Sequence, residues 1–267
     1  MSAAATAWGI VVRDVIRSTR QRSRLLSGLA RPFIWVFLVG AGFNGIARLQ
    51  DGMSYQAFAY PGGVVMAALF GGMLTAISTV YDREFGMLRL MLASPSGVGA
   101  VLSGRTLSAA LVGSMQATVV LICAPLAVHL TLAQYAAAAA ALVLVSLVSG
   151  TLGLLVASRL TSVENFGGVI NVVLFPLLFL SGALYPTAGM PPLLRAIARA
   201  NPVSYMVDLM RHAFGQGAEF SLRLDLAALI GTAIVGFGLT ALLFDPEQRF
   251  VGKKPSGEGR LTAVVQP

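Results

Sequence analysis

The chain has 267 residues, 56% hydrophobic and only 11% charged against about 25% in a typical soluble domain, which indicates an integral membrane protein. Its net charge of +8 is better explained by membrane orientation than by nucleic-acid binding, because in a membrane chain the positions of Lys and Arg matter more than their sum. A single cysteine, Cys123, excludes a disulfide framework and a cysteine-based metal site.

The N-terminal segment is expected to form a basic amphipathic helix. Its arginines recur at intervals of four, three and four residues and so share one helical face: Arg13, Arg17, Arg20 and Arg24. The other face carries mostly apolar residues, among them Trp8, Val11, Val12 and Val15. Such a helix suits the inner membrane interface beside anionic lipid. It either only anchors the first span or also forms a docking surface for a cytoplasmic partner.

Six apolar segments approach the length of about 20 residues that a membrane-spanning helix needs. The stretch 106–158 has no Asp, Glu, Lys or Arg, but a single helix over it would be about 80 Å long, more than twice the hydrocarbon core. It is therefore divided into two spans at a turn marked by Pro125, His129 and Gln134. The predicted spans are 29–47, 58–80, 104–126, 135–157, 167–185 and 226–244.

The expected fold class is all-α integral membrane, with one transmembrane domain over residues 1–251. The polar segment 252–267 is predicted to be a disordered tail. Small residues in the second span allow another helix to approach closely: Ala67, Ala68, Gly71 and Gly72.

The distribution of positive charge predicts the orientation. Six spans place both termini on one side, and the positive-inside rule makes this the cytoplasmic side. Of the 19 Lys and Arg residues, fourteen lie in segments on that side. The other five lie in outer segments: Arg48, Arg195, Arg199, Arg211 and Arg223.

A short charged helix is predicted between the second and third spans, on the cytoplasmic side. Asp82 and Glu84 are expected in its first turn and Arg89 near its end, the order that complements a helix dipole. Phe85, Leu88 and Leu92 recur at the spacing of one face, and Pro95 disfavours helix at the residue before it. This helix is either a lever for a cytoplasmic partner or an ordinary interfacial connector.

The loop before the sixth span is expected to contain two short helices separated at Pro202. The first carries an apolar stripe beside Arg195 and Arg199, and the second carries Tyr205 and Met206. Each is too short to span the membrane. They form either a re-entrant hairpin that acts as an outer gate or a simple amphipathic surface loop.

Several kinds of chemistry are not indicated by the sequence. The sequence contains no phosphate-binding loop of the form G-x-x-x-x-G-K-[ST]. Gly252-Lys253 could form its end, but Glu247 occupies the position five residues earlier that would have to be glycine. Ionisable residues occur only at the ends of the spans, where Arg31 and Arg105 can reach the inner interface, so ion coupling is not supported. His129 and His212 are far apart, which argues against a histidine-based metal site. No catalytic arrangement is recognisable, so an enzyme is not expected.

Two segments resemble motifs of one transporter family. "REFGMLRLMLASP" at 83–95 and "NPVSYMVDLMR" at 201–211 are similar to loops of the permease subunits of ATP-binding-cassette exporters of the second type. The resemblance covers most of the chain, and the small drug-resistance and nodulation-factor exporters are similar in length. It implies a bacterial inner-membrane permease that pairs with a second copy or a homologous permease and contacts lipid. ATP and Mg would be bound by a separate ABC ATPase subunit, with no cofactor in this chain.

The resemblance also assigns roles to residues. The ATPase-coupling helix would comprise Asp82, Arg83, Glu84, Phe85, Gly86, Leu88 and Arg89. The outer hairpin motif would comprise Asn201, Pro202, Tyr205, Asp208 and Arg211. The expected function is outward movement of a hydrophobic or amphipathic substrate (drug, lipid or glycolipid). The alternative is a passive channel or a membrane-anchoring subunit without ATP-coupled transport.

Overall fold

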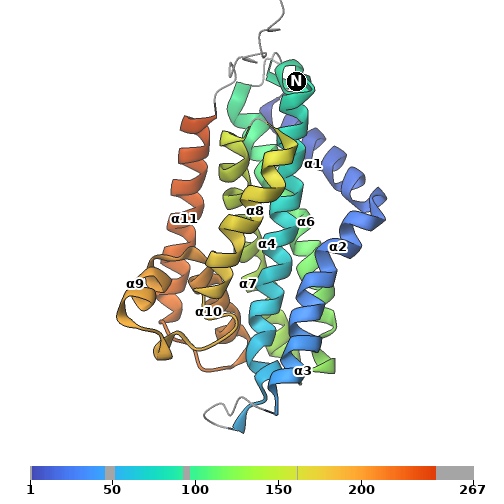
Figure 1. Cartoon of the computed structure of the whole chain (residues 1–267). Helices are drawn as coiled ribbons and strands as arrows, with labels where there is room; N and C mark the ends of the chain where they lie inside the picture. The colour runs from blue at the N-terminus through green and yellow to red at the C-terminus, as the bar shows by residue number, and fades with distance from the viewer. Residues whose placement is uncertain (1, 46–51, 93–96, 161, 245–267) are drawn as a thin grey trace, which may run out of the picture.

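The computed structural model of the chain describes residues 2–45, 52–92, 97–160 and 162–244, so the predicted tail at 252–267 lies outside it. The regular secondary structure within these ranges is entirely helical and forms an elongated bundle (Figure 1). The helices of its first half are α1 (Ala3–Arg20), α2 (Arg22–Phe33), π-helix η1 (Ile34–Val39), α3 (Gly40–Phe43), α4 (Tyr55–Glu84), α5 (Met87–Leu92) and α6 (Gly97–Ile122). The second half contains η3 (Ala124–Leu126), α7 (Leu132–Arg159), α8 (Val163–Phe179), η4 (Thr187–Gly189), α9 (Pro192–Ala200), α10 (Pro202–Phe214) and α11 (Leu222–Leu243).

Five described segments are long and apolar enough to cross a membrane. They are Leu25–Phe43, Tyr55–Glu84, Gly97–Leu126, Leu132–Arg159 and Leu222–Leu243. The predicted span at 167–185 corresponds to α8, which has only 17 residues. It ends earlier than expected because the chain turns at Ser181 and Gly182, where the glycine has a φ of +79°. The structure therefore supports a multi-pass membrane protein and five of the six predicted spans.

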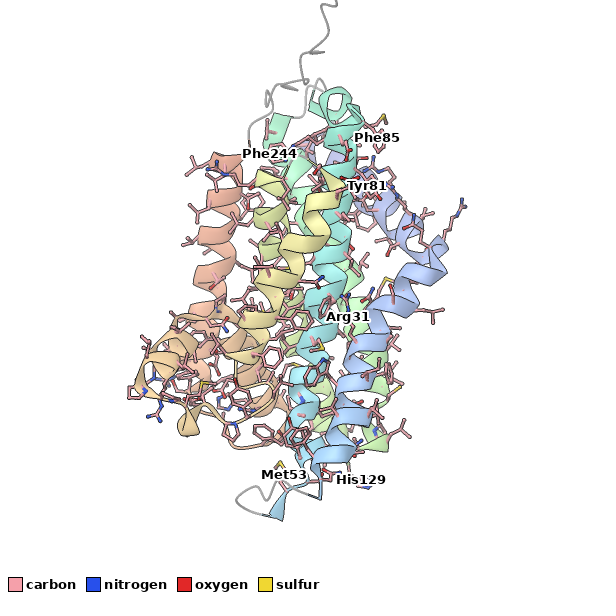
Figure 2. The ribbon with its side chains drawn as sticks, in the orientation of Figure 1. Arg31, Met53, Tyr81, Phe85, His129 and Phe244 are labelled. Carbon is pink, nitrogen blue, oxygen red and sulfur yellow. The ribbon has the colours of Figure 1, made fainter. Side chains whose placement is uncertain are left out.

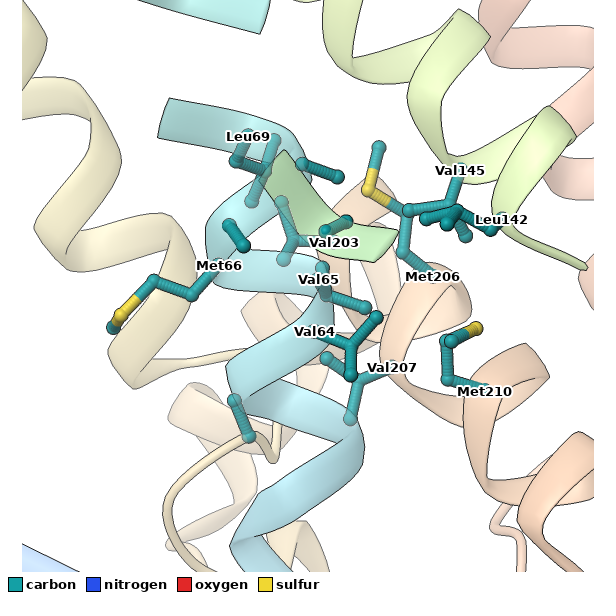
Figure 3. Close-up of a cluster of buried hydrophobic side chains, with 14 of the residues drawn as sticks. Val64, Val65, Met66, Leu69, Leu142, Val145, Val203, Met206, Val207 and Met210 are labelled. Atoms are coloured by element: carbon teal, nitrogen blue, oxygen red, sulfur yellow. The ribbon is translucent and has the colours of Figure 1, made fainter. Parts of the chain in front are cut away.

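Helix α4 is the central element of the bundle, and 89% of its apolar window is buried. It lies between α8 and the α2–η1 segment in Figure 1. Figure 3 shows Val64 and Val65 of α4 in a cluster with Met206 of α10 and Val145 of α7. A helix that is apolar on all sides has to be covered on all sides, which explains its place at the centre.

Glycines allow α4, α6 and α7 to approach closely, as the small residues of the second span predicted. A methyl group on Gly71 would lie 2.8 Å from the Cα atom of Gly113, and one on Gly113 would lie 2.7 Å from the carbonyl oxygen of Ala68. A methyl group on Gly150 of α7 would lie 2.8 Å from the carbonyl oxygen of Thr106. Backbone therefore packs directly on backbone at these crossings.

Helix α1 has one face against the bundle and another that is exposed. Its buried residues, Ile10, Val11, Asp14 and Ser18, pack mainly against α6. Trp8, Val12 and Ile16 form an exposed apolar face, with Trp8 61% exposed. The N-terminal helix is thus amphipathic as predicted, but one side of it is fixed to the bundle.

The two predicted short helices before the last span are present as α9 and α10. Asn201 separates them, and its side-chain oxygen accepts the N–H of Val203 at 3.0 Å, which caps α10. Pro202 occupies the first turn of α10, where its missing N–H costs nothing. Helix α10 is mostly buried, whereas Leu193 of α9 is 72% exposed.

We predict that Gly113→Val lowers the melting temperature of the purified protein, because the added side chain would overlap the α4 backbone at a cost of about 1–3 kcal/mol. Gly238→Val is the matched control, since it makes the same change in α11 where no atom lies within 4 Å of an added methyl group. Thermal unfolding in detergent measures both. Equal melting temperatures for the two variants would contradict the close packing of α4 and α6.

Candidate functional site

The last turn of α4 carries the charged triplet Asp82-Arg83-Glu84, at the end of the bundle that also carries α1 and α5, here called the α1 end. The prediction that these residues begin a new helix is wrong. Helix α4 continues through Glu84, and the Phe85 N–H still donates to the Tyr81 carbonyl at 3.0 Å. The break comes at Gly86, whose φ of +74° suits glycine, and α5 is a separate helix of six residues.

Carboxylates at a helix C-terminus oppose the helix dipole, so the acidic residues of the triplet need partners from elsewhere. Asp82 pairs with Arg105 of α6 and with Arg13 of α1, whose Nη2 atom lies 2.8 Å from Asp82 Oδ2. Asp14 of α1 completes the group, with its carboxylate 3.0 Å from each of the two guanidinium groups. We call Arg13, Asp14, Asp82 and Arg105 the buried ion-pair cluster.

The cluster is nearly closed to solvent. The side chains of Asp14, Arg105 and Asp82 are 1%, 2% and 9% exposed, and only Arg13 is partly open at 36%. Ser78 accepts a hydrogen bond from Arg105 at 3.0 Å, and Ser108 donates one to Asp14 at 3.1 Å. Two cations and two anions cancel, so the charges are buried as compensated pairs.

These positions correct the prediction for Arg105. Its guanidinium does not extend outward from the bundle, because two carboxylates hold it inside. Arg31 also lies along the bundle, with its guanidinium 4.5 Å from the ring centre of Phe70 (Figure 2).

The arginine face of α1 is only partly exposed. Burial disfavours the charge of Arg13, but Asp14 and Asp82 outweigh this and raise the pKa of Arg13. Arg17 lies 5.8 Å from the ring centre of Tyr81, and Arg20 is exposed. The side chain of Arg24 lies outside the described residues.

Arg83 and Glu84 connect α4 to the turn between α7 and α8. Arg83 Nη1 donates to the carbonyl oxygens of Ala157 and Leu160 at 3.0 and 2.7 Å, at the C-terminus of α7. Glu84 Oε2 accepts the N–H of Val163 at 3.2 Å, at the N-terminus of α8. Each charge therefore meets the end of a helix dipole that attracts it. The triplet does not cap its own helix but holds α1, α6, α7 and α8.

The turn after the triplet exposes a large apolar surface. Phe85 is 73% exposed and Met87 is 45% exposed, while Leu88 is buried against α1, α6 and α7. Figure 2 places Tyr81, Phe85 and Phe244 at the same end of the bundle. Phe85 and Leu88, which were predicted to share a helical face, are directed apart by the turn at Gly86. The side chain of Arg89 lies outside the described residues.

The predicted outer hairpin residues lie at the opposite end, here called the hairpin end. Asn201 Nδ2 donates to the Leu177 carbonyl of α8 at 2.6 Å, and the Tyr205 hydroxyl donates to the Arg199 carbonyl at 2.6 Å. These bonds fix α9 and α10 to each other and to the bundle.

Asp208 and Arg211 hold two loops at the hairpin end. Asp208 accepts the N–H groups of Glu219 and Phe220 at 2.8 and 2.7 Å, and Arg211 donates to the Gly182 carbonyl at 2.6 Å. Burial lowers the pKa of Arg211, while the carboxylates of Asp208 and Glu219 act in the opposite direction.

The sequence analysis missed the partners that complete the cluster, Asp14 and Arg105. Both carried a signal. Asp14 is the only acidic residue in the first fifty, set among arginines, and Arg105 is the only charged residue between Arg89 and Arg159. Isolated charges in an apolar chain need partners of opposite sign, so a pair between Asp14 and Arg105 could have been predicted.

Comparison with known proteins places this geometry in a family. Residues 6–214 match the family described as "ABC-2 type transporter", which is most of the chain and runs from α1 to the end of α10. The chain belongs to the ABC-2 type transporter family.

The relatives are similar over most of their length. The chain is 28% identical over 222 residues to nodulation protein J of Rhizobium meliloti (strain 1021), covering 82% of this chain and 85% of that protein. It is 28% identical over 211 residues to the Porphyra purpurea protein named "Putative transport permease ycf38", covering 77% of this chain and 72% of that protein. ABC-2 membership supports a transport role in a membrane and association with an ABC ATPase subunit.

We predict that Arg105→Leu destabilises the protein by about 3–5 kcal/mol, because it leaves Asp14 and Asp82 buried with only Arg13 to compensate them. Arg20→Leu makes the same chemical change at an exposed position of α1 and is expected to stay within about 0.5 kcal/mol of wild type. Thermal or denaturant unfolding in detergent compares them. An Arg105→Leu variant as stable as Arg20→Leu would show that the cluster does not hold the α1 end together.

Proposed function

We propose that this chain is the transmembrane permease subunit of an ATP-driven ABC exporter of the bacterial inner membrane. It moves a hydrophobic or amphipathic substrate outward, and a separate nucleotide-binding subunit binds ATP and Mg and hydrolyses the ATP. The observation that carries the proposal is the exposed Phe85-Gly86-Met87 turn, which is rigidly backed by the charged triplet of α4. An exposed aromatic residue, on a turn whose neighbouring side chains are fixed by ion pairs and hydrogen bonds, is a suitable contact point for a partner protein.

In this proposal the α1 end faces the cytoplasm. The Lys and Arg count of the sequence supports that orientation, and α8 supplies the sixth crossing despite its 17 residues. Both termini are then cytoplasmic. The exposed face of α1, with Trp8, Val12 and Ile16, would lie in the inner lipid interface, and the exposed face of α9 in the outer one.

Force would pass from the ATPase into the bundle through defined contacts. Pressure on Phe85 reaches α4 directly, and the buried ion-pair cluster carries it to α1 and α6. Arg83 and Glu84 transmit it to the ends of α7 and α8. Since the side chains at the end of α4 contact four other helices, its tilt would move them together.

A second copy, or a homologous permease, would complete the substrate path. Helices α8 and η1, which flank α4 in Figure 1, carry exposed apolar residues, including Leu38 of η1 at 71% and Val172 of α8 at 74%. The rings of Trp35 of η1 and Phe179 of α8 pack edge to face, with 6.0 Å between their centres. This contact links the two helices across α4. Separation of this aromatic pair would open a hydrophobic lateral path for the substrate between two copies.

The ATPase contact is tested by cross-linking from the exposed turn. In a Cys123→Ser background, Phe85→Cys carrying a photoactivatable thiol reagent is expected to capture a protein with a phosphate-binding loop from native membranes, because that residue would face the ATPase. Mass spectrometry identifies the captured chain.

Leu193→Cys is the matched control, since it is equally exposed, at 72%, but lies at the hairpin end. Capture of an ABC ATPase from position 85 and not from position 193 supports the proposal. Capture from both positions or from neither contradicts the assigned coupling surface. A passive channel or anchoring subunit would also show no substrate-stimulated ATP hydrolysis when reconstituted with the captured ATPase.

A further inference from the structure

The hairpin end contains a second group of ionisable side chains, formed by Asp208 and His212 of α10 and Asp225 of α11. Asp208 and His212 are one helical turn apart and therefore share a face. The first turn of α11 brings Asp225 against them. One candidate ligand atom from each of the three residues lies within 4.8 Å of the others.

Asp225 is the residue that needs an explanation. Its side chain is 0% exposed, and neither of its carboxylate oxygens has a hydrogen-bond partner among the described residues. Its ion-pair partner among the described residues is His212, whose Nε2 atom lies 3.4 Å from Asp225 Oδ2. A buried carboxylate without hydrogen bonds is strongly disfavoured unless a cation compensates it.

We propose that Asp208, His212 and Asp225 form a binding site for a divalent transition-metal ion of the zinc class. One imidazole nitrogen and two carboxylates are ligands that zinc accepts, with a fourth position for water or a carbonyl oxygen. The site fastens α10 of the outer hairpin to the beginning of the last membrane-spanning helix.

The spacing of the donors fits this assignment. Ligands about 2.0–2.2 Å from a tetrahedral zinc ion are roughly 3.4 Å from each other. The 3.4 Å separation of His212 Nε2 and Asp225 Oδ2 matches that value, and it is longer than a good hydrogen bond. The Phe220 carbonyl oxygen lies 3.0 Å from the same nitrogen. In the tautomer that carries its proton on Nε2, this oxygen accepts a hydrogen bond from the imidazole, and it is close enough to become the fourth ligand.

The local charge also favours a divalent cation. The ionisable side chains that interact here include three carboxylates, from Asp208, Glu219 and Asp225, and one guanidinium, from Arg211. Arg211 donates to the Gly182 carbonyl and its guanidinium lies 4.4 Å from the ring centre of Phe58, and among the described residues no ion pair joins it to Asp225. Asp208 receives its two backbone N–H groups and keeps a lone pair on each oxygen for a metal.

A route to the site exists. His212 is 30% exposed and lines a cavity of about 360 Å³ between α7, α10 and α11, whose other walls are alanine and leucine side chains. A metal site needs such an entry path, and the apolar walls strengthen the attraction between the ion and its ligands.

The test uses the full chain, purified through an affinity tag without histidine, stripped with a chelator and dialysed against Zn²⁺. Wild type is expected to retain one zinc ion per chain and to melt at a higher temperature with zinc than without. Asp225→Asn and His212→Gln are expected to bind zinc at least tenfold more weakly. Substitution with Co²⁺ should give visible absorption bands in wild type that are lost in both variants.

His129→Gln is the matched control, because it removes the other histidine, which is exposed, and it should bind zinc like wild type. The His212→Gln variant keeps the test valid if Asp225→Asn does not fold. A wild-type protein that retains no zinc, or that binds it no more tightly than His212→Gln does, overturns the proposal.

Discussion

Two carboxylates buried near one end of an apolar bundle, Asp14 and Asp82, cannot remain there without cations, and much of the structure follows from this constraint. Arg105 satisfies both of them from inside α6, and Arg13 joins them from α1. Because the four charges come from three helices, none of these helices can leave the group without stranding a buried charge. The N-terminal helix is thereby part of the bundle, although its exposed face is that of an interfacial helix.

The two ends of the bundle are held by different kinds of contact. At the α1 end, charges pair with charges and with the ends of α7 and α8. At the hairpin end, side chains such as Asn201 and Arg211 bind backbone carbonyls. Helix α4 connects both ends over its 30 residues, about 45 Å. Close contacts at its glycines with α6 and α7 make it a rigid connection between the two ends. A displacement at one end can therefore reach the other.

Five of the six spans and the two short helices could be predicted from the sequence, because apolar length and proline breaks are local properties. The end of α4 could not, because residues 82–84 look like the start of a charged helix until their tertiary partners are known. Arg13 and Asp82 are 69 positions apart, and Arg105 and Asp14 are 91 apart. Only packing shows which arginine meets which carboxylate. The role of the 83–95 loop in coupling stays a prediction. The structure shows instead the contacts that hold its first residues, Arg83 and Glu84, against α7 and α8.

The central claim is that α1, α4 and α6 move as one body. The direct measurement is the distance between spin labels at Trp8→Cys on α1 and Leu111→Cys on α6, in a Cys123→Ser background, within the reconstituted complex. Both positions are exposed and lie outside the buried ion-pair cluster. The account predicts one narrow distance distribution that is the same without nucleotide and with bound ATP, and that broadens in Asp14→Asn. A wild-type distance that changes by several ångström between nucleotide states would contradict it.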